Sequence, residues 1–190
     1  MDERHGDTHG TLTDYSGAFC PGLTWTEFSP EKLHETLALY RRMFLAIDGF
    51  WFLGVRDRFG EDTALDVDLW AWQKYFRYEI KQLRELFSIE GNDVEALFKL
   101  MQLSAWAGNM DVEWDLKNRS HGIARVVKCH TLSVLLRERT GRETRFCRDI
   151  EQKMFDIQTA CLNPEMKAQP LRLPPETLGT GICCEWELTC

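Results

Sequence analysis

The spacing of apolar residues changes once along the chain, and this change constrains the fold more than any other feature. Between Leu33 and Leu103 apolar residues recur at steps of three and four, which is the period of an amphipathic helix. From Met110 to Lys117 apolar and charged residues alternate, which indicates a strand with one buried face. Helices followed by strands predict an α+β fold with separate helical and sheet regions.

Capping signals divide the helical part into three. Ser29-Pro30-Glu31 begins a first helix, since serine caps it and proline suits its first position, and Phe59-Gly60 ends it. Asp62 or Thr63 can cap a second helix, and Asn92-Asp93 opens a third. Most of the tryptophans in and after these helices are expected in the core, namely Trp51, Trp70, Trp72, Trp106 and Trp114.

The rest of the chain predicts a ββααββ block. A hairpin turns at 118–122, helices follow over 130–139 and 147–162, and strands are expected at 166–173 and 182–188. We therefore expect N-terminal helices and then a four-stranded, mainly antiparallel sheet with helices on one face. Residues 1–28 are expected to be a tail, mobile over its first ten residues, and 29–190 a single domain.

Charge and hydropathy narrow the kinds of partner. The net charge is −7 and basic residues are interleaved with acids, which argues against binding a phosphate backbone. The longest apolar stretch, Phe44 to Val55, contains Asp48 and is too short to span a bilayer. We expect a small molecule or a metal ion as partner, with no nucleic acid and no membrane, and the sequence leaves a homodimer open.

The cysteines indicate a reducing compartment. Their number is odd, and the polar first ten residues do not resemble a signal peptide, so we expect reduced thiols and a cytoplasmic protein. No Cys-x-x-Cys motif is present, which argues against a zinc ribbon. The seven cysteines are Cys20, Cys129, Cys147, Cys161, Cys183, Cys184 and Cys190.

Some of these cysteines lie where a site could form. Cys147 and Glu151 are four apart on an expected helix, so both project from one face. Cys129 precedes an expected helix, whose N-terminus would stabilise a thiolate and lower its pKa. In the last strand, alternation puts Cys184 on the apolar face and Cys183 on the other. The alternative interpretation is that the cysteines are small core residues and Glu151 is solvated.

Asp48 is the one acid on an otherwise apolar helix face. A carboxylate there must be paired or must face a polar cavity, which would make Asp48 a site residue. The alternative is that Asp48 has no role in a site and that its neighbour Gly49 is there because its small size allows a close contact between helices.

A series of motifs runs through residues 30–190, namely Asp48-Gly49-Phe50-Trp51-Phe52, Phe59-Gly60, the alanine-rich opening of the second helix with Trp72, Cys129, Cys147-x-x-x-Glu151, Asn163-Pro164, Pro174-Pro175 and Cys184-Glu185-Trp186-Glu187. In this order they resemble an uncharacterised bacterial family of domains of unknown function. The family looks distantly similar to the aminothiazoline-carboxylate hydrolases, which open a small sulfur-containing ring. Two positions depart from the family pattern, since Leu173 stands where a cysteine is common and His130 where a proline is common.

The first hypothesis is a small-molecule enzyme or a metal-binding protein. Cys129, Cys147 and Glu151 would be catalytic, and the same residues with Cys184 would hold a metal, for which thiolate and carboxylate ligands suit zinc or iron. Without a metal, Cys129 or Cys147 would be the nucleophile, and the resemblance implies ring or amide hydrolysis. The alternative is a non-enzymatic sensor that binds a small apolar ligand in an aromatic pocket.

Overall fold

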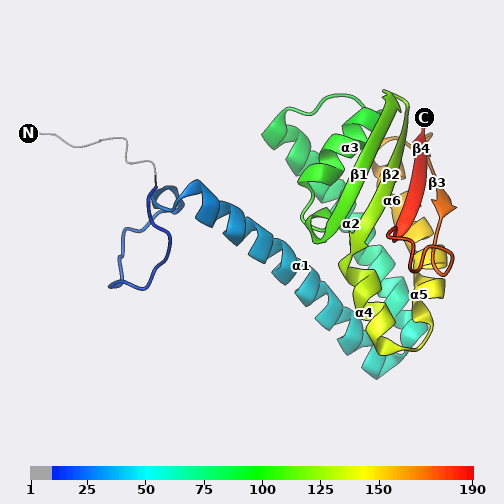
Figure 1. Ribbon diagram of the computed structural model, residues 1–190, viewed down its shortest axis with the longest axis horizontal. Helices are drawn as coiled ribbons and strands as arrows, with labels where there is room; N and C mark the ends of the chain where they lie inside the picture. The colour runs from blue at the N-terminus through cyan, green and yellow to red at the C-terminus, as the bar shows by residue number, and fades with distance from the viewer. Residues whose placement is uncertain (1–9) are drawn as a thin grey trace, which may run out of the picture.

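The computed structural model describes residues 10–190, so the expected mobile tail, with His5 and His9, falls almost entirely outside the described part. The chain forms helices first and a sheet afterwards (Figure 1). In chain order the elements are η1 (Trp25–Glu27), α1 (Pro30–Phe59), α2 (Glu61–Phe87), α3 (Val94–Leu103), η2 (Ala107–Asn109), β1 (Met110–Asn118), β2 (His121–Cys129), α4 (His130–Glu138), α5 (Arg142–Arg145), η3 (Phe146–Ile150), α6 (Glu151–Leu162), β3 (Lys167–Arg172) and β4 (Cys184–Thr189).

The predicted helix boundaries hold closely. Ser29 caps α1 by accepting a hydrogen bond from the Lys32 backbone N–H at 3.2 Å, and Asp93 caps α3 in the same way. Gly60, with φ of 89°, ends α1 and also occupies the position before α2. The second helix therefore begins at Glu61, and the predicted caps Asp62 and Thr63 lie inside it.

The four strands form one antiparallel sheet in the order β1-β2-β4-β3, which confirms the predicted fold class. β1 and β2 are the expected hairpin, with Trp114 opposite Ala124. β4 lies between β2 and β3, so that Trp186 pairs with Ala124 on one side and Pro170 on the other. Figure 1 shows β4 in red beside the green hairpin.

The two faces of the sheet differ in the way the alternation predicts. Trp186 is 1% exposed and stacks on Phe155 of α6, with ring centroids 4.3 Å apart. On the other face Arg125 bridges Glu113 at 3.0 Å and Glu185 at 2.6 Å. The core between the sheet, α3 and α6 consists of Val94, Leu97, Phe98, Met101, Ala124, Phe155, Met166, Ala168, Leu173, Trp186 and Leu188.

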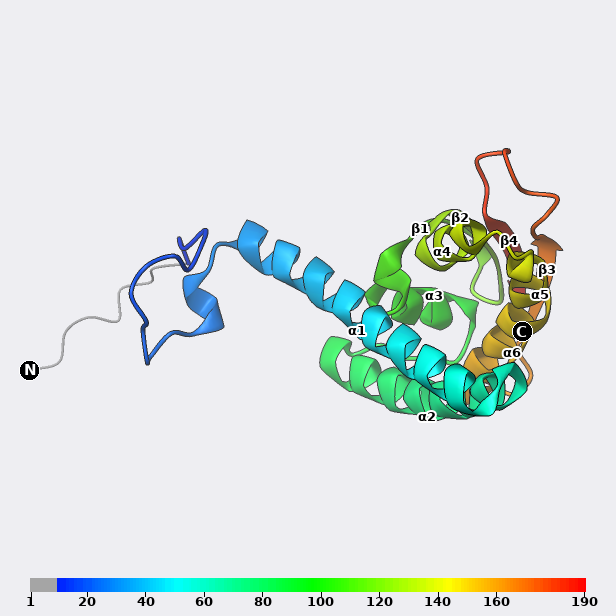
Figure 2. The ribbon, with the colours of Figure 1, turned by 90° about the horizontal axis from the view of Figure 1, so that it is seen from below.

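α1 is attached to α2 and to the segment before the sheet through its C-terminal part. Phe44 packs on Trp72 of α2, with ring centroids 6.0 Å apart. The carbonyl of Arg41 accepts a hydrogen bond from the Asn109 side chain at 3.1 Å. Beyond Arg41, toward its N-terminus, α1 runs clear of the body, and residues 10–28 lie around its start (Figures 1 and 2).

The expectation of buried tryptophans is wrong at two positions. Trp51 and Trp70 are 70% and 62% exposed, whereas Trp72 is buried. None of the helices in residues 10–190 is long and apolar enough to cross a membrane.

Candidate functional site

A cavity of about 330 Å³ lies between the inner face of the sheet and the helices α1, α2, α4 and α6. Most of its wall is apolar. The sheet supplies Val112, Trp114, Ala124, Val126 and Trp186, and the helices supply Leu45, Phe52, Trp72, Phe76, Leu132, Leu135, Met154 and Phe155.

The sequence-predicted site residues line this cavity together. Cys129 ends β2 and caps α4, with its sulfur accepting a hydrogen bond from the Leu132 backbone N–H at 3.3 Å. Cys147 lies in η3, Glu151 begins α6, and Cys184 begins β4. All four line the cavity. The segment between Cys129 and Glu151 leaves the end of the sheet and returns to it, and β4 starts at the same end with Cys184.

The backbone around Cys147 is a π-helical turn. The sequence predicted one continuous helix over 147–162, but Phe146–Ile150 (η3) is π-helical and α6 starts only at Glu151. Single π-helical turns occur frequently at functional sites. Here the turn places Cys147 and Glu151, the pair expected on one helix face, against the same cavity.

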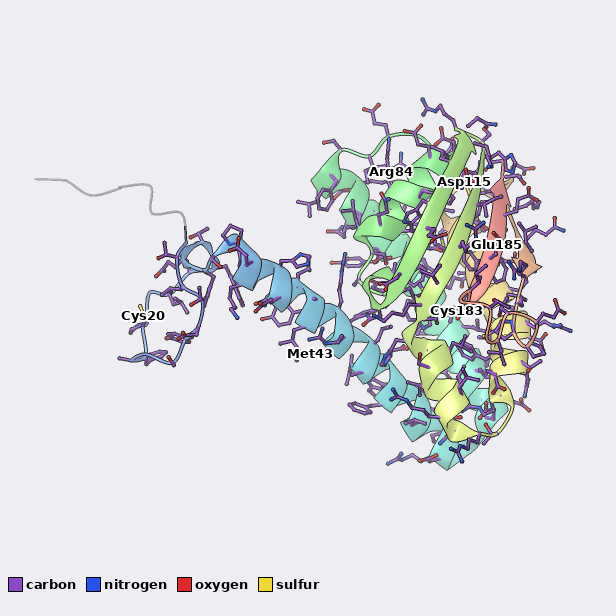
Figure 3. All side chains as sticks on the ribbon, in the orientation of Figure 1. Cys20, Met43, Arg84, Asp115, Cys183 and Glu185 are labelled. Carbon is purple, nitrogen blue, oxygen red and sulfur yellow. The ribbon has the colours of Figure 1, made fainter. Side chains whose placement is uncertain are left out.

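Cys183 also lines the cavity, which contradicts the prediction that it faces away from Cys184. The prediction assumed that both residues lie in a strand. β4 begins only at Cys184, so the alternation of side chains between the two faces of a strand does not apply to Cys183. Its backbone N–H donates to the Val126 carbonyl at 2.7 Å. Figure 3 shows Cys183 at the start of β4, next to the end of β2.

Two aspartates from different helices add to the acidic side chains in this wall. Asp48 of α1 faces the cavity, and a Cβ added at Gly49 would meet nothing within 4 Å, so close helix contact does not explain the glycine. Asp68 of α2 also lines the cavity and was missed in the sequence. The signal was present, since Asp68 precedes Trp72 by four residues and so shares its buried face.

These carboxyl groups have no cationic partner among the described residues. Arg142 is the one Lys or Arg among the lining residues described, and it is already paired with Glu61 at 3.1 Å and Glu138 at 2.6 Å. Burial therefore disfavours the charged forms of Asp48, Asp68 and Glu151, and no Lys or Arg of the described lining offsets this effect.

The pKa values of the three carboxyl groups reflect this burial. Burial raises the pKa of Asp48 to about 6 and that of Glu151 to about 7. For Asp68, burial and then repulsion by Asp48 raise the pKa to about 7. These groups gain and lose protons near neutral pH, as groups used in acid–base chemistry do.

The thiols are shifted in the direction opposite to the prediction. Burial raises the pKa of Cys129 to about 11 and that of Cys147 to about 12, and it also raises the pKa of Cys184. The Leu132 N–H bond lowers the pKa of Cys129, as expected at a helix start, but burial outweighs it. The charge of Glu151 raises all three further, so the thiols are neutral at pH 7.

The cavity does not contain a ready-made set of metal ligands. Within residues 10–190, no group of three or more His, Cys, Asp and Glu side chains is placed so that it could hold a metal ion. Cys129, Cys147, Glu151 and Cys184 thus share a cavity without forming a coordination shell in this arrangement. Zinc or iron stays a prediction, which metal analysis of protein purified without a histidine tag would test.

Comparison with known proteins gives one match. A family model described as "Family of unknown function (DUF6125)" matches residues 26–190. This confirms the resemblance to an uncharacterised family, whereas the similarity to aminothiazoline-carboxylate hydrolases stays a prediction. Searches of curated proteins and of solved structures found no match.

Proposed function

Because the chain belongs to this family of unknown function, we propose a function from the cavity itself: it binds a small molecule with an apolar body and a positively charged head group. The volume of about 330 Å³ lies at the lower end of the range for small-molecule sites. The aromatic wall supports the apolar body, because flat rings bury a large apolar area at fixed positions.

The observation that carries the proposal is the group of unpaired carboxyls in an apolar wall. Asp48, Asp68 and Glu151 come from three different helices and face one space. A buried carboxylate without a partner is costly, and a ligand ammonium group would remove that cost by pairing with it. The rings of Trp72 and Trp106 also favour a cation, since aromatic faces attract positive charge.

Hydrolysis of the bound molecule is a second candidate, favoured by Glu151. A carboxyl group with a pKa of about 7 can accept a proton and return it at neutral pH. The neutral thiols of Cys129 and Cys147 would need such a base before either could attack a carbonyl carbon. In this scheme Glu151 takes the thiol proton as the sulfur–carbon bond forms and gives it to the leaving nitrogen as the carbon–nitrogen bond breaks. A water molecule, deprotonated by Glu151, then attacks the thioester carbon, and the released sulfur takes the proton back, which leaves the acid product and the free thiol. A sensor that binds without reaction needs the same cavity but no proton transfer.

The binding proposal can be tested with two probes of nearly equal shape, 1-naphthylmethylamine and 1-naphthylmethanol. At pH 7.5 calorimetry should show the charged amine binding about tenfold or more tightly, which corresponds to about 1.4 kcal/mol. Glu151→Gln should reduce this preference, because the amide carries no charge.

Two glycines of α1 provide a matched pair of variants. Gly49→Leu should abolish binding of both probes, since the new side chain enters the cavity. Gly54→Leu places the same side chain in the same helix away from the cavity lining and should leave binding unchanged. Equal affinities for amine and alcohol would contradict the charged head group. Unchanged binding in Gly49→Leu would show that the probes bind elsewhere.

A further inference from the structure

α1 carries an apolar side that the described residues 10–190 cover only in part, at Phe44 and Tyr40. It has no buried residue over its 30 residues, a length of about 45 Å. One side of it carries apolar residues at steps of three and four, which we call the α1 stripe. The stripe consists of Leu33, Leu37, Tyr40, Phe44, Ile47, Trp51 and Val55.

The C-terminal half of the α1 stripe forms one wall of a groove. This groove, of about 420 Å³, lies between α1 and α2, with Val67 and Ala71 on the α2 side. Ile47 and Trp51 stand at it with 54% and 70% of their surface exposed. The groove adjoins the cavity described above, and four residues line both, namely Asp48, Phe52, Asp68 and Trp72.

The N-terminal half of the α1 stripe projects away from the body. Leu33, Leu37 and Tyr40 precede Arg41, the residue at which α1 is bound to the Leu103 and Asn109 region. The rings of Tyr40 and Trp25 meet edge to face with their centroids 6.2 Å apart, but Leu37 remains 51% exposed. Figure 2 shows this half projecting from the body, with residues 10–28 around its start, and Figure 3 shows Met43, near the end of this half, on the projecting helix.

We propose that two copies of this chain associate through the α1 stripe. In an antiparallel α1–α1 contact, the projecting half of each copy lies in the α1–α2 groove of the other. Both halves belong to the same stripe, so a single two-fold axis satisfies both contacts, as a symmetric dimer requires. The two α1 and two α2 helices then form a four-helix bundle.

The exposed area fits a dimer. Seven large apolar residues of α1 and α2 near the stripe and groove are between 37% and 70% exposed, namely Leu33, Leu37, Tyr40, Ile47, Trp51, Val67 and Tyr78. At roughly 100 Å² each, taken from side-chain areas of about 150–250 Å², they offer about 700 Å² per copy. A stable interface buries about 800 Å² per partner, and the flanking residues supply the remainder.

Sedimentation velocity on the full chain tests the proposal. The wild type should sediment as a dimer of twice 22.2 kDa at concentrations of tens of micromolar. Leu37→Glu, on the stripe, should shift the protein to monomer by at least a hundredfold in dimer dissociation constant, since two copies of a charge enter the interface.

Leu39→Glu is the matched control. Leu39 is also a leucine of the projecting half, and its exposure of 45% is close to that of Leu37. Two residues correspond to about 200° around a helix, so Leu39 lies on nearly the opposite side. This variant should remain a dimer, and circular dichroism should show both variants equally helical. A monomeric wild type, or equal dissociation of both variants, would overturn the proposal, and neither result bears on probe binding in the cavity.

Discussion

Replacement of Glu151 by glutamine should stabilise the protein at alkaline pH and have little effect at acid pH. The glutamine keeps the size of the side chain and removes its ability to carry charge. The pKa of Glu151 is raised from 4.5 to about 7 by burial, so the folded state holds this proton more tightly than the unfolded state. Stability therefore falls as pH rises from about 4.5 to about 7 and then levels off.

The size of the effect follows from that shift. Each pKa unit corresponds to about 1.4 kcal/mol, so charging Glu151 costs the folded state roughly 3 kcal/mol above pH 7.5. Removing that charge also relieves repulsion on Asp68 and on the thiols of Cys129, Cys147 and Cys184. Glu151→Gln should thus gain up to about 3 kcal/mol at pH 8 but under about 1 kcal/mol at pH 5, which lies just above the unfolded-state pKa of 4.5.

Urea unfolding of wild type and variant at pH 5, 6, 7 and 8, with chelator present, measures the difference directly. For a chain of this size about 3 kcal/mol corresponds to a rise in Tm of roughly 6–12 °C. Glu165→Gln, on an exposed residue beyond the end of α6, is the control and should change little at any pH. A gain for Glu151→Gln that is the same at pH 5 and pH 8, or a loss at pH 8, would refute the assignment of Glu151 as a buried, unpaired carboxyl.

Two further predictions concern the core and the thiols. Trp186→Ala should cost about 3–5 kcal/mol in urea unfolding, because the ring is 1% exposed and stacks on Phe155, and a cost below about 1 kcal/mol would place this face of the sheet in solvent. Thiol labelling at pH 7.5, followed by peptide mass spectrometry, should modify the exposed Cys20 and Cys190 well ahead of Cys129, Cys147 and Cys184. The raised pKa values of the latter three keep them neutral at this pH. Fast reaction at Cys147 would mean that its pKa is instead lowered.

The periodicity of the sequence was sufficient to predict the three N-terminal helices and the four strands, but not α5 or the π-helical turn η3. The alternation after Met110 follows from which side chains the sheet buries, whereas the steps of three and four in α1 mark a helix that has no buried residue. The convergence of Cys129, Cys147, Glu151 and Cys184 on one cavity follows from topology. The end of the second strand at Cys129 and the helix start beside Cys147 were expected near the same end of the sheet, and the structure brings the start of β4 to the same cavity.

What the sequence did not predict depends on distant contacts. Trp51 and Trp70 have the pattern of buried residues, but burial depends on a partner surface that residues 10–190 do not supply. The helix start lowers the pKa of Cys129 and burial raises it, so the sign of the shift depends on which effect is larger. Only the structure shows how deeply Cys129 is buried. The direction of the Cys183 side chain depends on whether β4 begins at Cys183 or at Cys184. A periodic pattern predicts the ends of a strand less well than its middle.

The position of β4 in the sheet has a consequence for the order in which the fold can form during synthesis. β4 is made after β1, β2 and β3, yet it lies between β2 and β3. Until residues 184–189 leave the ribosome, β2 and β3 have no shared neighbour, and each presents an open edge able to pair with another chain. Cys184 and Trp186 arrive with the same strand, so the cavity wall is completed only in this last step. A nascent chain that stops at Cys183 would therefore hold the helices and the hairpin but no closed cavity.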